Sequence, residues 1–375
     1  MIQCSPHLSS SKIIQTHPTT FGVLDIHFSP THKSIFAVAA STGLVAFYQL
    51  HSNNVSASPS INHIDSIQVV EQDIIVTSLA WNPAAPDQLA ITLTNGDVGT
   101  LDIPSRVLDT NISSPLPQPE LQQTTDDDSQ LEVLFTHSLE AWTTSILPPT
   151  WPYTGLLSGG DDAVLSYSPL PPSSRAHNIP AQSPQPAAWT NRRIHSAGVT
   201  ALLPLTVTIK VADEEQQHNY LITGSYDDHL RILLPPSLGQ KQPQVLHERN
   251  LGGGVWRIKL VEQDAKEMHG ASGWEWRGVL LVSCMYAGAK IVEVNAVLGA
   301  DGGGRDEEVV WSSKVVAEFV EHESMCYACD VQPSSSGGTG VEEERLSDAG
   351  DVGEKTILSC SFYDKRLCLW RWKHG

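Results

Sequence analysis

The stretch from Ser359 to Trp372, SCSFYDKRLCLWRW, alternates apolar and polar residues, breaks once at Tyr363-Asp364-Lys365, and then resumes the alternation. This pattern predicts two short strands joined by a tight turn. Residues 156–165 and 221–232 have the same form, again with an Asp in the turn. A hairpin unit that recurs along a chain indicates a repeat architecture. The sequence therefore predicts an all-β fold, a WD-repeat β-propeller.

About six such units are recognisable, and seven blades are usual for propellers of this kind. The units span residues 21–50, 76–103, 137–169, 195–234, 252–294 and 322–372. We expect one propeller domain over residues 21–375, because a blade can bury its faces only against its neighbours. The short N-terminal segment, residues 1–20, has room for one strand, so we expect a first blade to be missing or degenerate. A six-bladed ring, an incomplete ring, and a blade built from poorly patterned sequence remain alternatives.

Three segments between the units are rich in Pro, Gly, Ser and acidic residues and poor in apolar ones. They cover residues 104–130, 169–190 and 333–355. Such segments cannot bury enough apolar surface to pack. We expect them to be mobile loops.

The charge balance and the cysteine pattern limit the partners and the compartment. The formal net charge is -19, from 23 basic and 42 acidic residues, which argues against nucleic-acid binding. The most apolar segment, residues 278–294, is interrupted by polar residues and is too short to span a bilayer. The N-terminus lacks the pattern of a secretory signal, and the six cysteines show no disulfide framework. We expect a reduced, cytoplasmic monomer without a membrane partner, a metal or an organic cofactor.

Polar residues recur at fixed places in three hairpins. An Asp stands inside each turn and a His stands at the start of the same unit; the sets are His137 with Asp162, His195 with Asp227, and His322 with Asp364. A buried carboxylate needs hydrogen-bond donors of this kind. We expect these sets to be mainly structural.

Two other motifs are candidates for function. The residues just before the turn Asp, namely Asp161, Tyr226 and Tyr363, should face the mouth of the ring, where propellers bind ligands. The string from Gly252 to Lys259, GGGVWRIK, lacks the ending of a nucleotide-binding loop. It fits either a backbone held close to a ligand, with Trp and Arg aimed at one site, or a tight turn between blades.

Other chemical signatures are weak or absent. Cys326 and Cys329 have redox or metal spacing, but strand alternation places their sulfurs on opposite faces, which favours two packed thiols. The sequence contains neither a Gly-x-Ser-x-Gly elbow nor a His-Glu-x-x-His motif. Standard esterase and zinc-protease signatures are therefore absent.

Several strings resemble the WD-repeat diphthine methyl esterases, called diphthine methyltransferases in older naming, of the diphthamide pathway. The resembling strings are Glu140-Ala141-Trp142, residues 158–162, 223–229, 252–259 and 284–291, Glu323-Ser324 with Tyr327 and Asp330, and residues 360–372. Two features depart from the family: it has a further blade before the equivalent of Phe21, and it has Tyr-Gly-x-Asp-Trp where this chain has Tyr327-Ala328-Cys329-Asp330-Val331.

The resemblance implies a carboxylic ester hydrolase that removes a methyl group, as methanol, from methylated diphthine on translation elongation factor 2. This modified histidine carries a trimethylammonium group and a methyl ester. Aromatic faces hold a quaternary ammonium well, and the candidates for such a cage are Trp142, Tyr226, Trp256 and Tyr363.

Ester hydrolysis also needs an activated water or nucleophile and a donor for the developing oxyanion. We expect Arg257 to be the donor. The candidates for base or nucleophile are His322, Glu323 and Ser324, while Asp161 is a candidate for orienting or activating water. The alternative is a non-catalytic scaffold that presents elongation factor 2 or another client to a separate enzyme. The absence of a nucleophile motif favours this alternative.

Overall fold

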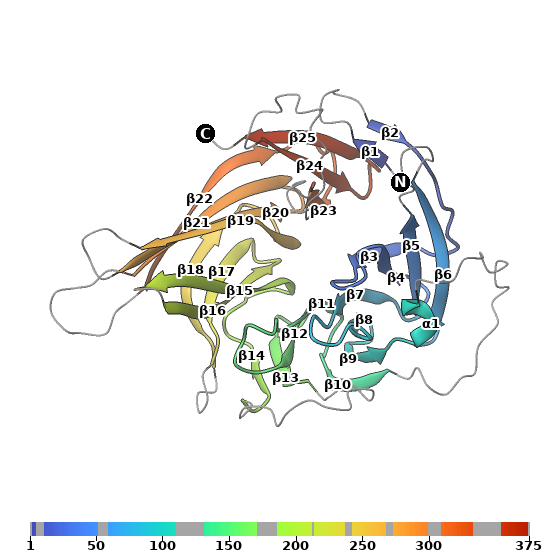
Figure 1. The fold of residues 1–375 in the computed structure, drawn as a ribbon, viewed down its shortest axis with the longest axis horizontal. Coiled ribbons are helices and arrows are strands. Elements are labelled where there is room, and N and C mark those ends of the chain that lie inside the picture. The colour runs from blue at the N-terminus through green and yellow to red at the C-terminus, as the bar shows by residue number, and fades with distance from the viewer. Residues whose placement is uncertain are drawn as a thin grey trace.

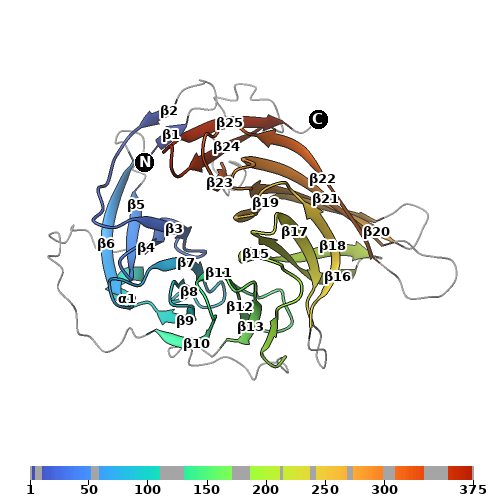
Figure 2. The ribbon, with the colours of Figure 1, turned by 180° about the vertical axis from the view of Figure 1, so that it is seen from behind.

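The computed structural model describes residues 2–4, 11–51, 59–109, 131–170, 186–211, 214–236, 242–267, 273–298, 309–332 and 354–373. Six antiparallel sheets succeed one another around a common centre (Figures 1 and 2), with the first strand of each sheet innermost. The expected all-β propeller and its six blades are confirmed.

The first three blades contain four strands each, paired in chain order. Blade I consists of β3 (Val23–Phe28), β4 (Ile35–Ala40), β5 (Leu44–His51) and β6 (Ser60–Gln68); blade II of β7 (Val76–Trp81), β8 (Gln88–Leu93), β9 (Asp97–Asp102) and β10 (Glu132–Thr136); blade III of β11 (Ala141–Ile146), β12 (Gly155–Gly160), β13 (Leu165–Pro169) and β14 (Trp189–Asn191).

Blades IV and V also have four strands, and the described part of blade VI has three. Blade IV consists of β15 (Val199–Val211), β16 (Glu214–Ser225), β17 (His229–Leu234) and β18 (Gln244–Asn250); blade V of β19 (Arg257–Glu267), β20 (Trp274–Ser283), β21 (Ala289–Leu298) and β22 (Val309–Phe319); blade VI of β23 (Cys326–Val331), β24 (Glu354–Ser361) and β25 (Leu367–Lys373).

The N-terminal segment forms a small sheet of its own. β1 (Ile2–Cys4) pairs with β2 (Ser11–Ile13), and no pairing with blade VI is recorded among the described residues. Just after β2, the side-chain amide of Gln15 accepts a hydrogen bond from the backbone N–H of Ile61 at 2.7 Å and donates one to its carbonyl at 3.1 Å. The segment is thereby tied to β6, the outer strand of blade I.

Most of the described core lies between blades, and one apolar cluster, around Phe36 and Tyr48, lies within blade I. The second strands β4, β8 and β12 are buried along their whole length, because each lies between two neighbouring sheets. Apolar clusters join blades I and II (Ile35, Phe47, Leu79, Trp81), II and III (Ala90, Ile146, Leu156), III and IV (Leu157, Tyr167, Leu221), IV and V (Ile222, Leu280, Val282), and V and VI (Leu281, Ile291, Ile357, Trp372). Each fully buried Leu or Ile contributes roughly 2 kcal/mol.

The junction between blades VI and I differs from the other five. No apolar cluster joins these two blades within the described ranges. On β3, the side chains of Val23, Ile26 and Phe28 remain exposed. At this place the family resemblance predicts a further blade, and these exposed side chains lie on the strand that such a blade would adjoin.

The segments expected to be loops lie mostly outside the described residues. Where they are described, short regular elements occupy their ends: α1 (Ser105–Leu108) follows β9, Trp189 and Thr190 begin β14, and Glu354 and Lys355 begin β24. In the part of the chain that the structure describes, no helix has the length and apolar character needed to span a bilayer.

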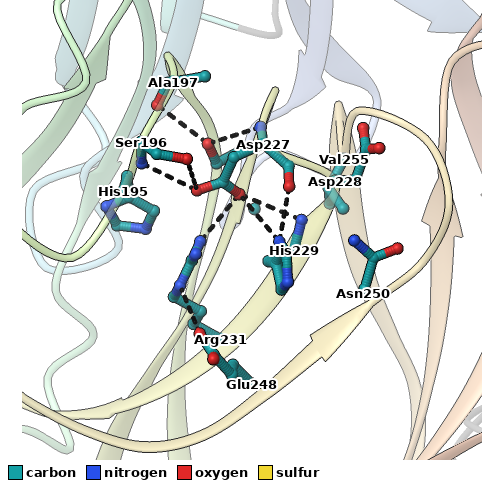
Figure 3. A network of polar contacts seen from close by, with 12 residues as sticks. His195, Ser196, Ala197, Asp227, Asp228, His229, Arg231, Glu248, Asn250 and Val255 are labelled. Carbon is teal, nitrogen blue, oxygen red and sulfur yellow. Dashed lines mark hydrogen bonds and ion pairs between the residues drawn. The ribbon is translucent and has the colours of Figure 1, made fainter.

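The polar network of blade IV shows how a turn carboxylate is held (Figure 3). Asp227 accepts hydrogen bonds from the backbone N–H of Ser196 at 3.0 Å, the backbone N–H of His229 at 3.1 Å, and Nη1 of Arg231 at 2.9 Å. Burial opposes ionisation of Asp227, but these donors outweigh it and lower its pKa to about 2. The carboxylate is therefore a fixed, charged part of the blade.

The expected His–Asp contact occurs in one of the three sets. In blade III, Nδ1 of His137 lies 3.0 Å from Asp162. The expectation is wrong for the other two sets. In blade IV, Arg231 rather than His195 pairs with Asp227, and the ring of His195 contacts the hydroxyl group of Thr223 at 3.0 Å.

In blade VI the expected partners are also exchanged. The ring of His322 contacts the hydroxyl groups of Ser361 at 2.9 Å and Ser359 at 2.8 Å. Asp364 instead accepts hydrogen bonds from the Ser324 hydroxyl at 2.6 Å and the Glu323 backbone N–H at 3.0 Å. Serine hydroxyl groups thus contact His322 in place of the expected carboxylate of Asp364.

Replacing His195 with Gln should make stability less sensitive to acid. Burial lowers the pKa of His195 from 6.5 to about 4, so the unfolded chain binds a proton between those values while the folded chain does not. Stability therefore falls as pH falls through this window. Between pH 7 and pH 5 the wild type should lose about 2 kcal/mol more unfolding free energy than His195→Gln in urea denaturation. Equal losses would contradict this assignment.

Candidate functional site

An aromatic cluster gathers around Trp256 at one end of the ring. We call this end the mouth; it carries the turns with Asp161, Tyr226, Tyr286 and Tyr363 and the loop that ends at Trp256. The ring of Trp256 lies 5.6 Å from that of Trp142, 5.7 Å from Tyr226 and 4.9 Å from Tyr327, centroid to centroid. Blades III, IV, V and VI therefore each supply one aromatic ring.

Backbone hydrogen bonds, one of them between blades IV and V and two within a blade, hold the main chain at this cluster. The N–H of Val255 donates to the carbonyl of Ser225 at 3.0 Å, and the N–H of Trp256 donates to that of Ser283 at 2.9 Å. The N–H of Tyr226 donates to the carbonyl of Gly198 at 2.9 Å. The main chain that carries Tyr226 and Trp256 is thereby anchored.

The glycine string ahead of Trp256 forms a tight turn between blades IV and V. Gly252 has φ +76°, a left-handed conformation that favours glycine. A Cβ on Gly253 would lie 2.3 Å from the carbonyl oxygen of Cys284 in blade V. The turn interpretation of the string is therefore correct, and the same turn places Trp256 and Arg257 together at the mouth.

Arg257 connects the aromatic cluster with the opposite side of the ring. Its guanidinium carbon lies 5.6 Å from the centroid of the Trp256 ring. Its Nη1 donates to the carbonyls of Thr200 and Trp256, each at 3.4 Å. Its Nη2 lies 3.4 Å from Oδ2 of Asp25, on blade I. The side chain is 24% exposed, so the guanidinium is held from several sides and still reaches solvent.

Asp25 is a buried carboxylate with partners from three blades. Its Oδ2 accepts hydrogen bonds from the hydroxyl of Ser78 at 2.8 Å and the backbone N–H of Leu79 at 3.3 Å, while its Oδ1 lies 3.2 Å from Nε2 of His27. Burial opposes ionisation, but Arg257, His27 and Ser78 together hold the pKa of Asp25 well below its usual range. A permanent negative charge therefore lies beneath the mouth.

Asp161 stands beside the aromatic cluster. Its carboxylate accepts a hydrogen bond from Nε1 of Trp142 at 3.3 Å, and its side chain is open to solvent. Burial raises the pKa of Tyr226, and the neighbouring Tyr327 and Asp161 raise it further. The Tyr226 hydroxyl therefore stays protonated at neutral pH and can donate a hydrogen bond.

His322, Glu323 and Ser324 lie together in blade VI, where each is engaged within the blade. Both ring nitrogens of His322 contact serine hydroxyls, and Ser324 donates to Asp364. The Glu323 carboxylate forms an ion pair with Arg366 at 2.6 Å. None of the three has a recorded contact with Arg257 within the described residues. Their recorded side-chain contacts lie within blade VI.

Tyr363 adjoins the cluster through Tyr327, with which it shares a side-chain hydrogen bond, and through the ring of Phe362. Its ring lies 5.2 Å from Phe362, which lies 6.3 Å from Tyr327, which in turn contacts Trp256. Phe362 and Tyr363 are 67% and 66% exposed. Of the four predicted cage residues, Trp142, Tyr226 and Trp256 are therefore in direct contact, and Tyr363 lies at the edge.

Sequence reasoning missed Asp25, His27, Tyr327 and Phe362 as site residues. Tyr327 and Phe362 stand within strings that carry the family resemblance, which is a usable signal. Asp25 and His27 occur in Val23-Leu24-Asp25-Ile26-His27-Phe28, an ordinary alternating strand. Only the closure of the ring brings this strand to Arg257.

Two buried cysteines, Cys284 and Cys326, are inert thiols. Burial raises the pKa of both Cys284 and Cys326 to about 12, so these thiols stay protonated. In the described ranges, no three His, Cys, Asp or Glu side chains are grouped so that they could hold a metal ion.

These features define a β-propeller whose mouth carries an aromatic cluster next to a fixed guanidinium. The chain is similar to the diphthine methyltransferase of Saccharomyces cerevisiae, with 27% identity over 96% of this chain and 85% of that protein. It is also similar to the Schizosaccharomyces pombe diphthine methyltransferase, with 28% identity over 93% and 78%. A Dictyostelium discoideum homolog is 24% identical over 96% and 78%. The family resemblance expected from the sequence is confirmed.

The comparisons with family models and with solved structures do not extend this resemblance. No family model matches the chain. Among solved structures, Sqt1 from Chaetomium thermophilum is similar, with a TM-score of 0.48 and 11% identity, covering 98% of this chain and 78% of that one.

The glycine string gives a direct test of the turn. Gly253→Ala should lower the unfolding free energy by roughly 2 kcal/mol or more, because a backbone oxygen blocks the new Cβ. Gly252→Ala should cost only about 1 kcal/mol, since its Cβ meets no atom within 4 Å and the cost is that of the left-handed backbone. Urea denaturation measures both; a larger loss for Gly252→Ala would contradict this ranking.

Proposed function

We propose that this chain acts in diphthamide biosynthesis as a cytoplasmic carboxylic ester hydrolase that converts the methyl ester of diphthine on translation elongation factor 2 into diphthine and methanol. Two independent observations support the proposal. The relatives at 27% and 28% identity are named for diphthine. The mouth places an aromatic cluster beside a fixed guanidinium, and the Trp256–Arg257 pair is the observation that carries the proposal.

The aromatic cluster suits the trimethylammonium group of the substrate. A quaternary ammonium has no N–H to donate, so it is held by the negative faces of aromatic rings rather than by hydrogen bonds. The guanidinium of Arg257 already lies over Trp256. We therefore place the ammonium against Trp142 and Tyr226, on the side of the cluster where Asp161 adds a negative charge.

Arg257 suits the ester end of the same side chain. A guanidinium is always charged and presents several N–H donors. Two carbonyls and the Asp25 carboxylate hold it in place before reaction. A donor that is fixed beforehand stabilises the developing oxyanion without reorganising during the reaction. The ammonium and the ester are thus bound by neighbouring groups of one cluster.

Ester hydrolysis also needs a group that orients the substrate or the attacking water. We propose that Asp161, which is exposed beside Trp142, orients the substrate or a water molecule. For His322, Glu323 and Ser324 the geometry favours structural roles, because their polar atoms are already paired within blade VI.

Exposed aromatic side chains at the mouth favour a protein as the client. Tyr286, Phe362 and Tyr363 are 65%, 67% and 66% exposed, on turns of blades V and VI. Exposed aromatic groups of this kind are common in protein interfaces. They fit the docking of elongation factor 2 by an esterase, and they fit equally the alternative function, a scaffold that presents this client to another enzyme.

Changing either member of the Trp256–Arg257 pair should impair ester hydrolysis without unfolding the protein. Arg257→Ala would remove the guanidinium that pairs with the buried carboxylate of Asp25, which is destabilising, so Arg257→Lys is the better variant. We expect Arg257→Lys to lower kcat by about 10²-fold or more, because the lysine cannot reproduce the planar donor geometry. Trp256→Ala should mainly raise KM, because it removes the centre of the aromatic cluster. Methanol release from methylated elongation factor 2 measures both effects.

Arg371→Gln is the matched control, since Arg371 pairs with Glu354 on blade VI, away from the Trp256–Arg257 pair. It should keep wild-type kcat and KM. Wild-type turnover by folded Arg257→Lys and Trp256→Ala proteins would exclude the pair from the reaction. Binding of elongation factor 2 without any methanol release would favour the scaffold.

A further inference from the structure

A base for ester hydrolysis must have a free lone pair near the oxyanion donor. Arg257 cannot serve, because a guanidinium does not give up its proton in proteins. His137 and His322 use both ring nitrogens in contacts with neighbouring side chains. His195 is buried. The histidines that the sequence singled out are therefore held as parts of the blades.

His27 has a different environment. Its side chain is 47% exposed, and its Nε2 lies 3.2 Å from Oδ1 of Asp25. Across the described residues, no hydrogen-bond partner of its Nδ1 is recorded. A carboxylate on one ring nitrogen selects the tautomer and orients the ring, which leaves the other nitrogen with a lone pair that can accept a proton.

The same carboxylate holds Arg257. His27 approaches Oδ1 of Asp25, whereas Nη2 of Arg257 approaches Oδ2 at 3.4 Å. The hydroxyl of Ser78 and the backbone N–H of Leu79 fix this carboxylate from blade II. An imidazole and a guanidinium are therefore positioned by the two oxygens of one buried group, and Trp256 adjoins that guanidinium.

We propose that His27 is the general base of the esterase and that Asp25 positions both His27 and Arg257. This inference rests on the proposed function. Nδ1 of His27 takes a proton from water while the water oxygen bonds to the ester carbonyl carbon. The carbonyl electron pair moves to its oxygen, beside Arg257. Collapse of this intermediate breaks the bond to the methoxy oxygen, which takes the proton from Nδ1 and leaves as methanol; the product acid then ionises.

The test is steady-state kinetics of methanol release from methylated elongation factor 2. His27→Ala should lower kcat by about 10²-fold or more with little change in KM, because the base acts in the chemical step rather than in binding. Added imidazole should restore part of the lost kcat, an effect that a purely structural role would not produce. His32→Ala, in the turn after β3, is the matched control and should behave as wild type.

Asp25→Asn separates positioning from catalysis. In nitrogen-15 spectra of the wild type, neutral His27 should carry its proton on Nε2, and Asp25→Asn should shift the ring toward a mixture of tautomers and lower kcat. This spectroscopic measurement does not depend on activity. If Asp25→Asn does not fold, His27→Ala and the wild-type spectrum carry the test.

The possible results distinguish the two proposals. An active wild type with a fully active His27→Ala variant would overturn the role of His27 and leave the esterase intact. Loss of kcat that imidazole does not restore, together with a wild-type His27 protonated on Nδ1, would also overturn it. A folded wild type that binds the substrate and releases no methanol would overturn the proposed function itself.

Discussion

The buried carboxylate of Asp25 joins three blades at the centre of the ring, and the arrangement of the mouth depends on it. Its partners come from its own strand, from blade II and, through Arg257, from blade V. A buried charge is tolerated only where it is paired and hydrogen-bonded. Because blades VI and I share no apolar cluster in the described ranges, this ion pair is a polar tie that spans that side of the ring. Strand β3, the guanidinium and the aromatic cluster are thus fixed relative to one another.

Hydrogen-bond partners separate the structural polar groups from those available for chemistry. Asp227 has its donors within blade IV, and His322 contacts two serines, so these groups stabilise turns. His27 and Arg257 instead keep donor or acceptor capacity while a shared carboxylate orients them. In the proposed function the ammonium and the ester occupy neighbouring places at the mouth, and the Trp256–Arg257 pair is the observation behind that proposal.

The blades could be predicted from the sequence because strand alternation and turn residues are local signals. The Trp256–Arg257 pair could be singled out for the same reason, since the glycine string adjoins it. Asp25 and His27 could not, because Arg257, the partner of Asp25, lies far along the chain and β3 has an ordinary strand pattern. The partner of Asp227 was also missed: a His at the blade start was expected, but Arg231 on the adjacent strand reaches the carboxylate. The pairing of Asp25 with Arg257 depends on the closure of the ring, whereas the pairing of Asp227 with Arg231 lies within one hairpin of blade IV.

The central claim is that the mouth hydrolyses the methyl ester of diphthine, and mass spectrometry tests it most directly. Purified methylated elongation factor 2 is incubated with this protein alone, and the mass of the peptide that carries the modified histidine is then measured. We expect a loss of about one methylene with release of one equivalent of methanol. An unchanged or increased mass, with a folded protein that binds elongation factor 2, would contradict the account.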